Sequence, residues 1–203
     1  AGERHIGWKV GLTAKAIQQQ FGFHEPVFGC VLETVPSGHM FPAGSLINPG
    51  FECELCMRLG RDLVPGADLA AARAAVAEIY PALEIIETRV PMTQIPCAMA
   101  DNAQQKTCVL GAPAPLPAAP ESVLCSVEIN GQPAATGTGD AVLGNPLNSL
   151  VWLAGKLTSH GRALRAGDIV MTGSFTRQFP ISPGDRIRVT FAGVGVVEAG
   201  MTA

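Results

Sequence analysis

The sequence predicts a β-rich α+β domain in which helices pack on the outside of a rolled sheet. Two observations carry this prediction. The 203-residue chain contains 23 Gly and 16 Pro, and these residues separate short apolar segments, a spacing typical of many short strands and turns. Hydrophobic residues make up 47% of the chain, which is enough for one domain with a sizeable core. We therefore expect residues 1–203 to form a single domain.

The strands are expected where apolar and β-branched residues run between these breakers. The segments are 6–12, 28–33, 51–59, 83–90, 106–110, 123–130, 168–173 and 186–198. Three further stretches predict helices. Residues 14–22 end at a glycine, residues 67–80 are rich in alanine and are followed by Pro81, and residues 145–161 carry leucines at helical spacing and end at Gly161.

Composition limits the partners that this chain is expected to have. The net charge is -3 without any Lys/Arg run, so neither nucleic acid nor an anionic membrane is an expected partner. No apolar run approaches the ~20 residues that a membrane helix needs. Charged residues make up only 15%, which is low for a soluble monomer and indicates a partly covered surface, as in a homo-oligomer.

The six cysteines are expected to be reduced core residues in a cytoplasmic protein. Most of them sit in apolar, strand-like runs, and a chain of this length and hydrophobicity does not need a disulfide framework. Cys53 and Cys56 form one C-x-x-C, but no second pair or nearby His completes a zinc site.

Three glutamates predict a cation site. Glu52 and Glu54 lie two residues apart in the strand-like run FECELCMRL, so both point to the same face. Glu84 follows thirty residues later, after the Ala-rich helix, and can return beside the first strand. Because the surroundings are apolar and buried unpaired carboxylates are costly, the three predict a hard divalent cation such as magnesium. Glu87 is expected to pair with Arg89 or to face solvent.

An ordered set of motifs covering nearly the whole chain from Gly7 resembles a known family. The motifs are GWKVGLT (7–13), EPVFG (25–29), E-x-E (52–54), YPALEIIETR (80–89), ADNA (100–103) and GDIVMTGS (167–174). Together they are similar to the 2-keto-4-pentenoate hydratase and 4-oxalocrotonate decarboxylase branch of the fumarylacetoacetate hydrolase superfamily. A preceding N-terminal segment is usual in that family, so we expect one before this chain.

The resemblance implies a mixed β-roll, a Mg²⁺ or Mn²⁺ ion and a small 2-oxo or 2-hydroxydienoate substrate. It assigns the metal to the same residues, Glu52, Glu54 and Glu84. It also makes Lys9 a catalytic residue, whereas a lysine in an apolar strand otherwise reaches out to the surface. Beside a bound keto acid, a cation would hold developing negative charge or transfer a proton.

Further residues are implied to contact the substrate. They are Leu12, Asp101, Asn102, Thr172, Gly173 and Ser174. Without the resemblance, Asp101 and Asn102 indicate a capped turn, and the Thr-Gly-Ser run indicates a strand end. Small hydroxyl residues often follow ADNA in relatives, whereas this chain has Gln104 and Gln105.

Position 27 leaves the reaction open. Hydratase relatives commonly carry an acid where this chain has Val27, and decarboxylase relatives tend to carry an uncharged residue there. The expected activity is a hydratase that forms a 4-hydroxy-2-oxo acid in aromatic catabolism. The alternatives are a 4-oxalocrotonate-type decarboxylase and a keto-acid-binding homologue without turnover.

Overall fold

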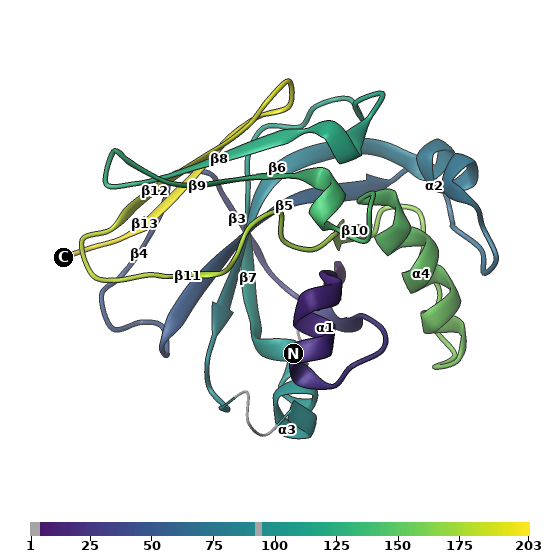
Figure 1. The fold of residues 1–203 in the computed structure, drawn as a ribbon, viewed down its shortest axis with the longest axis horizontal. Helices are drawn as coiled ribbons and strands as arrows, with labels where there is room; N and C mark the ends of the chain where they lie inside the picture. The colour runs from purple at the N-terminus through teal and green to yellow at the C-terminus, as the bar shows by residue number, and fades with distance from the viewer. Residues whose placement is uncertain (1–4, 92–94) are drawn as a thin grey trace.

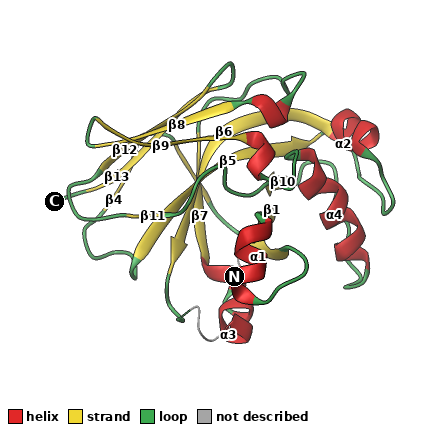
Figure 2. Ribbon diagram, viewed as in Figure 1, coloured by secondary structure: helices red, strands yellow, loops and turns green. Residues whose placement is uncertain are grey.

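The computed structural model describes residues 5–91 and 95–203, which fold into two curled sheets with helices on the outside (Figures 1 and 2). The larger sheet contains β1 (Gly7–Gly11), β2 (Val27–Val31), β3 (Thr34–Pro36), β5 (Pro49–Leu59), β6 (Val76–Glu87), β7 (Gln105–Leu110), β10 (Ile169–Met171) and β11 (Phe179–Pro180). The smaller sheet contains β4 (His39–Phe41), β8 (Leu124–Ile129), β9 (Gln132–Thr138), β12 (Arg186–Phe191) and β13 (Gly195–Met201). The helices are α1 (Lys15–Phe21), α2 (Leu69–Ala75), α3 (Ile95–Ala100) and α4 (Leu147–Thr158), with single 3₁₀ turns η1 (Asn102–Gln104), η2 (Pro120–Ser122) and η3 (Gly139–Ala141).

Both sheets mix parallel and antiparallel pairs. The larger sheet has the order β2-β1-β10-β5-β6-β7-β3, with β11 added beside β5, and the smaller has the order β4-β13-β12-β8-β9. The pairs β1–β10, β3–β7 and β4–β13 are parallel, and the long central pair β5–β6 is antiparallel. The predicted β-rich α+β class with a rolled sheet is therefore confirmed.

The core lies between the two sheets and continues under α2 and α4, which contact each other (Figure 1). Strand β5 is buried on both faces along most of its length. One face packs in the core that includes the smaller sheet, α2 and α4, and the other faces side chains of β2, β7 and β10 inside the curled larger sheet. The six cysteines are all free. Cys53, Cys56, Cys108 and Cys125 are buried, as expected of core residues, but Cys30 is only partly buried and Cys97 is exposed, so the prediction is wrong for Cys97.

The helix predicted over residues 67–80 is wrong in its second half. Helix α2 begins after Asp68, whose carboxylate accepts a hydrogen bond from the Ala71 N–H (2.8 Å), and ends at Ala75. From Val76 the chain is strand β6, paired with β5, so long-range pairing overrides alanine's helical preference. Pro81 lies inside this strand. The Pro81 carbonyl accepts a hydrogen bond from the Gly111 N–H (2.8 Å), just beyond the last β6–β7 pair. Because Pro81 lies at this end of the ladder, its missing N–H removes no hydrogen bond from the middle of the sheet.

The other predicted elements appear with shifted ends. The helices at 14–22 and 145–161 are confirmed as α1 and α4, and α1 ends at Gly22 in the left-handed conformation (φ 71°). The single strand expected over 186–198 is a hairpin, β12 and β13. Strands β3, β4, β9 and β11 and helix α3 were not predicted, because they are short or poor in β-branched residues. Within the described residues, no helix is long and apolar enough to cross a membrane.

Candidate metal centre and substrate pocket

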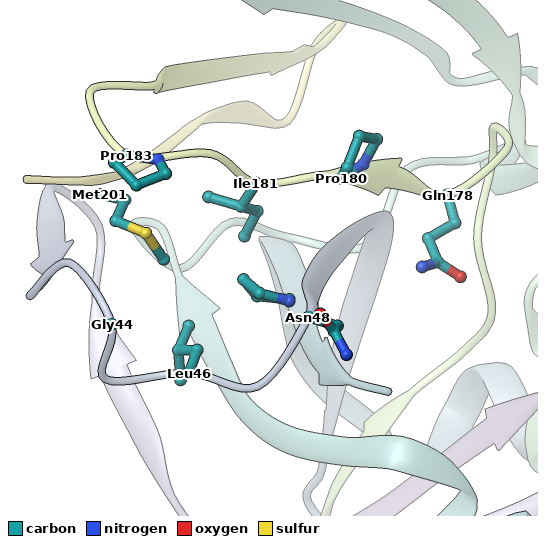
Figure 3. A pocket seen from close by; sticks show the side chains of 9 residues that line it. Gly44, Leu46, Asn48, Gln178, Pro180, Ile181, Pro183 and Met201 are labelled. Atoms are coloured by element: carbon teal, nitrogen blue, oxygen red, sulfur yellow. The ribbon is translucent and has the colours of Figure 1, made fainter. Parts of the chain in front are cut away.

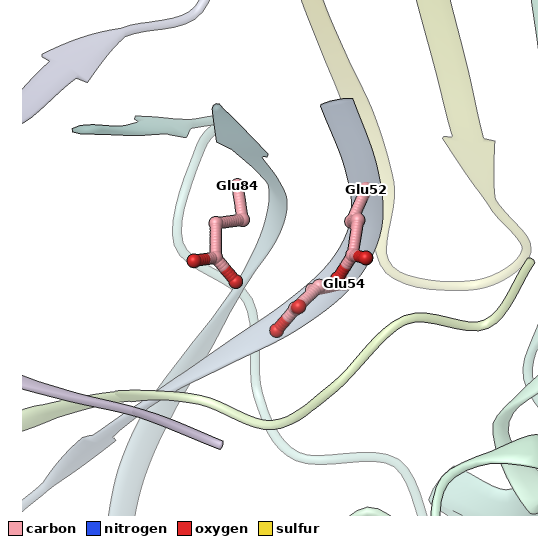
Figure 4. A group of neighbouring side chains, drawn as sticks. All are labelled: Glu52, Glu54 and Glu84. Atoms are coloured by element: carbon pink, nitrogen blue, oxygen red, sulfur yellow. The ribbon is translucent and has the colours of Figure 1, made fainter. Parts of the chain in front are cut away.

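The pairing of β5 with β6 brings three glutamates together. Glu52 lies directly opposite Glu84 in the antiparallel register, and Glu54 lies two residues further along the same face of β5. One carboxylate oxygen from each of the three lies within 4.8 Å of the others. Figure 4 shows the three side chains converging from the two strands. Glu54 and Glu84 are fully buried, and Glu52 is partly exposed.

The carboxylates lack the hydrogen bonds that buried charges require. Among the described residues, Glu54 Oε1 and both oxygens of Glu84 have no hydrogen-bond partner. Burial, followed by repulsion from Glu84, raises the pKa of Glu52 to about 7, against the opposing effect of Lys9. Burial and the two neighbouring carboxylates raise the pKa of Glu54 well above its usual range. Three crowded oxygen donors with unsatisfied lone pairs fit a hard divalent cation.

Lys9 approaches this cluster from β1. Its Nζ lies 3.1 Å from Glu84 Oε1, an ion pair whose alignment is too poor for a hydrogen bond, and the residue is 4% exposed. Lys9 pairs with Met171, which pairs in turn with Cys56, so Lys9 lies on the same face of the curled sheet as Glu52 and Glu54. Burial alone would lower the pKa of Lys9, but Glu84 and Glu52 together raise it above its usual value. The ammonium therefore stays charged.

The turn after β10 completes the cluster. The Gly173 N–H donates to Glu54 Oε2 (2.8 Å), and the backbone there has φ 115°. A Cβ at Gly173 would lie 2.5 Å from the Thr13 side chain, so only glycine fits. Thr172 is fully buried, and its hydroxyl donates to the Leu55 carbonyl (2.8 Å). The N–H of Gly173 and the hydroxyl of Thr172, both predicted to contact substrate, thus bind the protein itself.

A cavity of about 260 Å³ opens beside Glu52. Its lining residues are Lys9, Gly11, Leu12, Thr13, Ala14, Ile17, Val27, Glu52, Ile86, Met99, Ala103, Gln104, Ser174, Thr176, Arg177 and Gln178. Of the predicted substrate-contacting residues, Leu12 and Ser174 are in this wall. Leu12 is left-handed (φ 54°), and the Ser174 hydroxyl accepts a hydrogen bond from the Cys53 N–H (3.2 Å). The charged side chains among the lining residues are Lys9, Glu52 and Arg177.

The segment after α3 reaches the pocket through a strained turn. Asn102, Ala103 and Gln104 all have positive φ (57°, 49° and 65°), which is costly for residues other than glycine. The Asn102 side chain holds this turn against β2, because it accepts from the Cys30 N–H (2.7 Å) and donates to the Cys30 carbonyl (2.9 Å). Ala103 and Gln104, rather than the Asn102 side chain, consequently line the pocket.

An arginine two residues after the end of β6 holds the same segment. The Arg89 guanidinium binds the Asp101 carboxylate (2.9 and 3.1 Å) and the Gln105 carbonyl (3.1 Å). It also pairs with Glu87 (2.6 Å), so the expected partner of Glu87 is confirmed. The second oxygen of Glu87 accepts from the Ile47 N–H (3.0 Å). Glu87 therefore belongs to this network and not to the metal cluster.

A second, larger cavity shares Gln178 with the first but contains no titratable side chain. It encloses about 570 Å³ and is more open to solvent, and its wall includes Asn48, Gln178, Ile181 and Met201 (Figure 3). None of its lining residues is charged. We place the reactive site in the smaller pocket because that one holds the acids and Lys9.

Several pocket residues carried too weak a signal to be predicted from sequence. Thr13 is the last residue of the GWKVGLT motif but is not among the predicted substrate contacts, and Thr176, Arg177 and Gln178 come one residue after the TGS run, beyond Phe175. Extending the second motif by a few residues would have found these three. Ile17 on α1 and Met99 on α3 carried no comparable signal, because only the packing of those helices brings them to the pocket.

The raised carboxylate pKa values predict how a cation changes stability with pH. A group whose folded pKa lies above its unfolded value binds more protons when folded, so stability falls as pH rises through that interval. For Glu52 the interval is 4.5 to about 7. In EDTA we expect the melting temperature to fall between pH 5 and pH 7.5, and we expect Mg²⁺ to raise it more at pH 7.5 than at pH 5. Differential scanning fluorimetry at both pH values measures this. An equal Mg²⁺ effect at both would contradict it.

Comparison with known proteins places these features in a family. Residues 34–202 match the fumarylacetoacetate (FAA) hydrolase C-terminal family model. The chain is 36% identical to 2-keto-4-pentenoate hydratase 1 of Dechloromonas aromatica, over 98% of this chain and 78% of that protein. It is 32% identical to 2-hydroxyhexa-2,4-dienoate hydratase of Comamonas testosteroni, over 96% and 77%. The 4-oxalocrotonate decarboxylase of Pseudomonas putida G7, solved with magnesium and adipate, superposes with a TM-score of 0.94 at 33% identity, over 98% and 79%.

Proposed function

This chain belongs to the fumarylacetoacetate hydrolase family, and from that premise we propose that it is a metal-dependent hydratase. It adds water to a 2-hydroxy-2,4-dienoate of the 2-keto-4-pentenoate type and forms a 4-hydroxy-2-oxo acid. The observation that carries the proposal is the buried Glu52–Glu54–Glu84 cluster with Lys9 at the wall of a small pocket. Its sequence similarity to named hydratases supports the reaction type.

The three glutamates are the residues that would hold a divalent cation, Mg²⁺ or Mn²⁺. Their unsatisfied oxygens fit such an ion, and the Gly173 N–H keeps Glu54 oriented toward the cluster. When bound, the ion would supply a Lewis acid for the carboxylate and 2-oxygen of the substrate.

Lys9 is the group suited to stabilise charge that develops on the substrate. Glu84 keeps it protonated, and its position in the pocket wall lets it face a bound acid. In the reaction, the 2-hydroxydienoate becomes an unsaturated ketone as a proton is added at the far end of the diene, and water then adds at C4. The charged Lys9 stabilises the enolate that forms along this route. The hydroxyls of Thr13, Ser174 and Thr176 and the amides of Gln104 and Gln178 are polar groups in the wall that can orient the attacking water.

A decarboxylase is the second candidate, favoured by Val27. This side chain lines the pocket opposite Gly11 in the β1–β2 pair, and valine cannot transfer protons. The 0.94 TM-score with a decarboxylase structure supports the same alternative. Hydration and decarboxylation can both proceed through an enolate stabilised at the same place. The two reactions differ in which pocket residues contact the far end of the substrate.

We further propose that residues 1–203 act as one catalytic domain within a cytoplasmic homo-oligomer that binds neither nucleic acid nor membrane. The low charged fraction of 15% and the exposed Ile47 and Val64 support a covered surface. The free cysteines suit a reducing compartment.

An ultraviolet assay tests the proposed reaction. With Mg²⁺ we expect the protein to remove the absorbance of 2-hydroxypenta-2,4-dienoate without releasing carbon dioxide, and we expect EDTA to stop the reaction. Carbon dioxide released from 4-oxalocrotonate would instead establish the decarboxylase. Turnover of neither compound by Mg²⁺-bound protein would contradict both.

A further inference from the structure

We propose that the Thr13 hydroxyl binds the substrate directly, by donating a hydrogen bond to the carboxylate at the acid head of the bound dienoate. The inference rests on the proposed function, because it assumes that this acid head lies at the glutamate cluster. It gives one hydroxyl of the pocket wall a defined partner and leaves the orientation of water to the other polar groups of the wall.

The turn after β1 holds Thr13 in a fixed position. Leu12 has a left-handed backbone (φ 54°), which ends the regular alternation of the strand. Its carbonyl accepts a hydrogen bond from the side-chain N–H of Gln18 (2.7 Å), a buried residue of α1. Backbone of this kind persists in a residue other than glycine only where the surrounding structure holds it. Thr13 therefore belongs to an anchored turn and not to a free loop.

This turn brings Thr13 to the inner end of the pocket. Its side chain packs against Gly173, where a Cβ would lie 2.5 Å from Thr13 Oγ1, and the Gly173 N–H donates to Glu54 (2.8 Å). Two residues before Thr13, Lys9 Nζ lies 3.5 Å from the position that a Cβ on Gly11 would take. The Thr13 hydroxyl consequently lies beside the turn that orients Glu54, on the segment that the Lys9 ammonium reaches.

The Thr13 hydroxyl is the one wall hydroxyl without a hydrogen bond to any described residue. The Ser174 hydroxyl accepts from a backbone N–H (3.2 Å), and the Thr176 hydroxyl donates to a backbone carbonyl (3.0 Å). Among the described residues, the side-chain oxygens that are both unpartnered and sealed from solvent are carboxylate oxygens of the cluster. Thr13 is 5% exposed and lines the pocket, so its hydroxyl is open to whatever occupies that pocket.

A carboxylate is the partner that suits this hydroxyl. An ionised carboxylate only accepts hydrogen bonds and has about four lone-pair sites, so one contact at the cluster leaves others for a neighbouring donor. A hydrogen bond to a charged acceptor is also stronger than one to water or to a neutral group. The acid head of a 2-oxo acid held at the cluster presents such an oxygen at the inner end of the pocket, where Thr13 lies.

Binding of two unreactive acids with the same head tests the proposal. Pyruvate and 2-oxopentanoate share the carboxylate and the 2-oxygen and differ in their tails. In calorimetric titrations of Mg²⁺-loaded protein, we expect Thr13→Val to weaken the binding of both acids by about 10–100-fold, as the loss of a hydrogen bond to a charged group implies. Valine keeps the branched shape that packs against Gly173, so the change removes the hydroxyl alone.

Two further measurements separate binding from support of the fold. Thr13→Ser keeps the hydroxyl and should restore most of the affinity for both acids. Mg²⁺ affinity in the absence of an acid should be the same in wild type, Thr13→Val and Thr13→Ser. Thr190→Val is the matched control, because Thr190 is exposed on β12 of the smaller sheet, and it should change none of these affinities.

Unchanged binding of both acids in Thr13→Val would overturn the role of Thr13 and leave the proposed function standing. A loss confined to 2-oxopentanoate would also overturn it, because the hydroxyl would then contact the tail. Weaker Mg²⁺ binding without an acid would mean that Thr13 acts only by supporting Gly173 and Glu54. If the wild type binds neither acid, both proposals fail. Binding that depends on Thr13, without turnover of 2-hydroxypenta-2,4-dienoate, would overturn only the proposed reaction.

Discussion

Replacing Glu84 by Gln is expected to weaken Mg²⁺ binding by more than about 100-fold, because it removes the negative charge of one of the three proposed carboxylate ligands. Loss of an outer-shell partner alone costs about 10–100-fold. Activity should become undetectable. The same change leaves Lys9 buried without its ion-pair partner. Breaking a buried pair in this way destabilises by about 3–5 kcal/mol, so Glu84→Gln should also unfold at lower urea in EDTA.

Comparison with Glu54→Gln separates the loss of a metal ligand from the loss of the ion pair with Lys9. Glu54 is buried and its Oε1 has no partner among the described residues, so a neutral amide at this position removes the free-energy cost of ionising a buried carboxylate. We expect this variant to lose Mg²⁺ binding as Glu84→Gln does, but to be at least as stable as wild type in EDTA. Glu33→Gln, at an exposed position, is the control. Calorimetry with Mg²⁺ and urea unfolding measure the two effects. Retained Mg²⁺ affinity in either cluster variant would contradict the metal assignment.

The second large effect concerns Lys9. Lys9→Met should lower kcat by about 10²–10³-fold, the range typical of losing one group that stabilises developing negative charge. Mg²⁺ affinity should be kept or increased, because the ammonium competes with the metal for Glu84. The variant would thus separate chemistry from metal binding. Arginine should not restore the rate, since its larger planar guanidinium does not fit the buried position of the compact ammonium.

Lys156→Met is the matched control, because that lysine pairs with the exposed Glu25. Steady-state kinetics and Mg²⁺ calorimetry on both variants provide the measurement. A normal kcat in Lys9→Met would exclude a catalytic role for this residue. Lost Mg²⁺ binding would mean that Lys9 acts by supporting the cluster.

Local sequence patterns are enough to predict much of the site. The two-residue repeat of a strand puts Glu52 and Glu54 on one face, and their apolar neighbours indicate burial. The spacing to Glu84 predicts a returning strand, which the structure contains as β6. The pairing of Glu87 with Arg89 is likewise predictable, because the two residues are neighbours in sequence.

Local sequence patterns do not predict where the returning strand begins or its register with β5. Alanines at 67–80 favour a helix, yet the chain after Ala75 is strand because it completes the ladder with β5. That antiparallel register puts Glu84 opposite Glu52. A shift of one residue would have turned Glu84 to the other face.

By itself, then, the sequence determined the fold class, the helices at 14–22 and 145–161, and the three acids that face one another. Only the tertiary structure decided their partners. It brings Lys9 to Glu84, bonds the side chains of Asn102 and Thr172 to the protein backbone, and stacks Arg177 on Phe179. The physical reason is that periodicity fixes which face a side chain takes, whereas the curl of the sheet and long-range strand pairing decide what lies across from it.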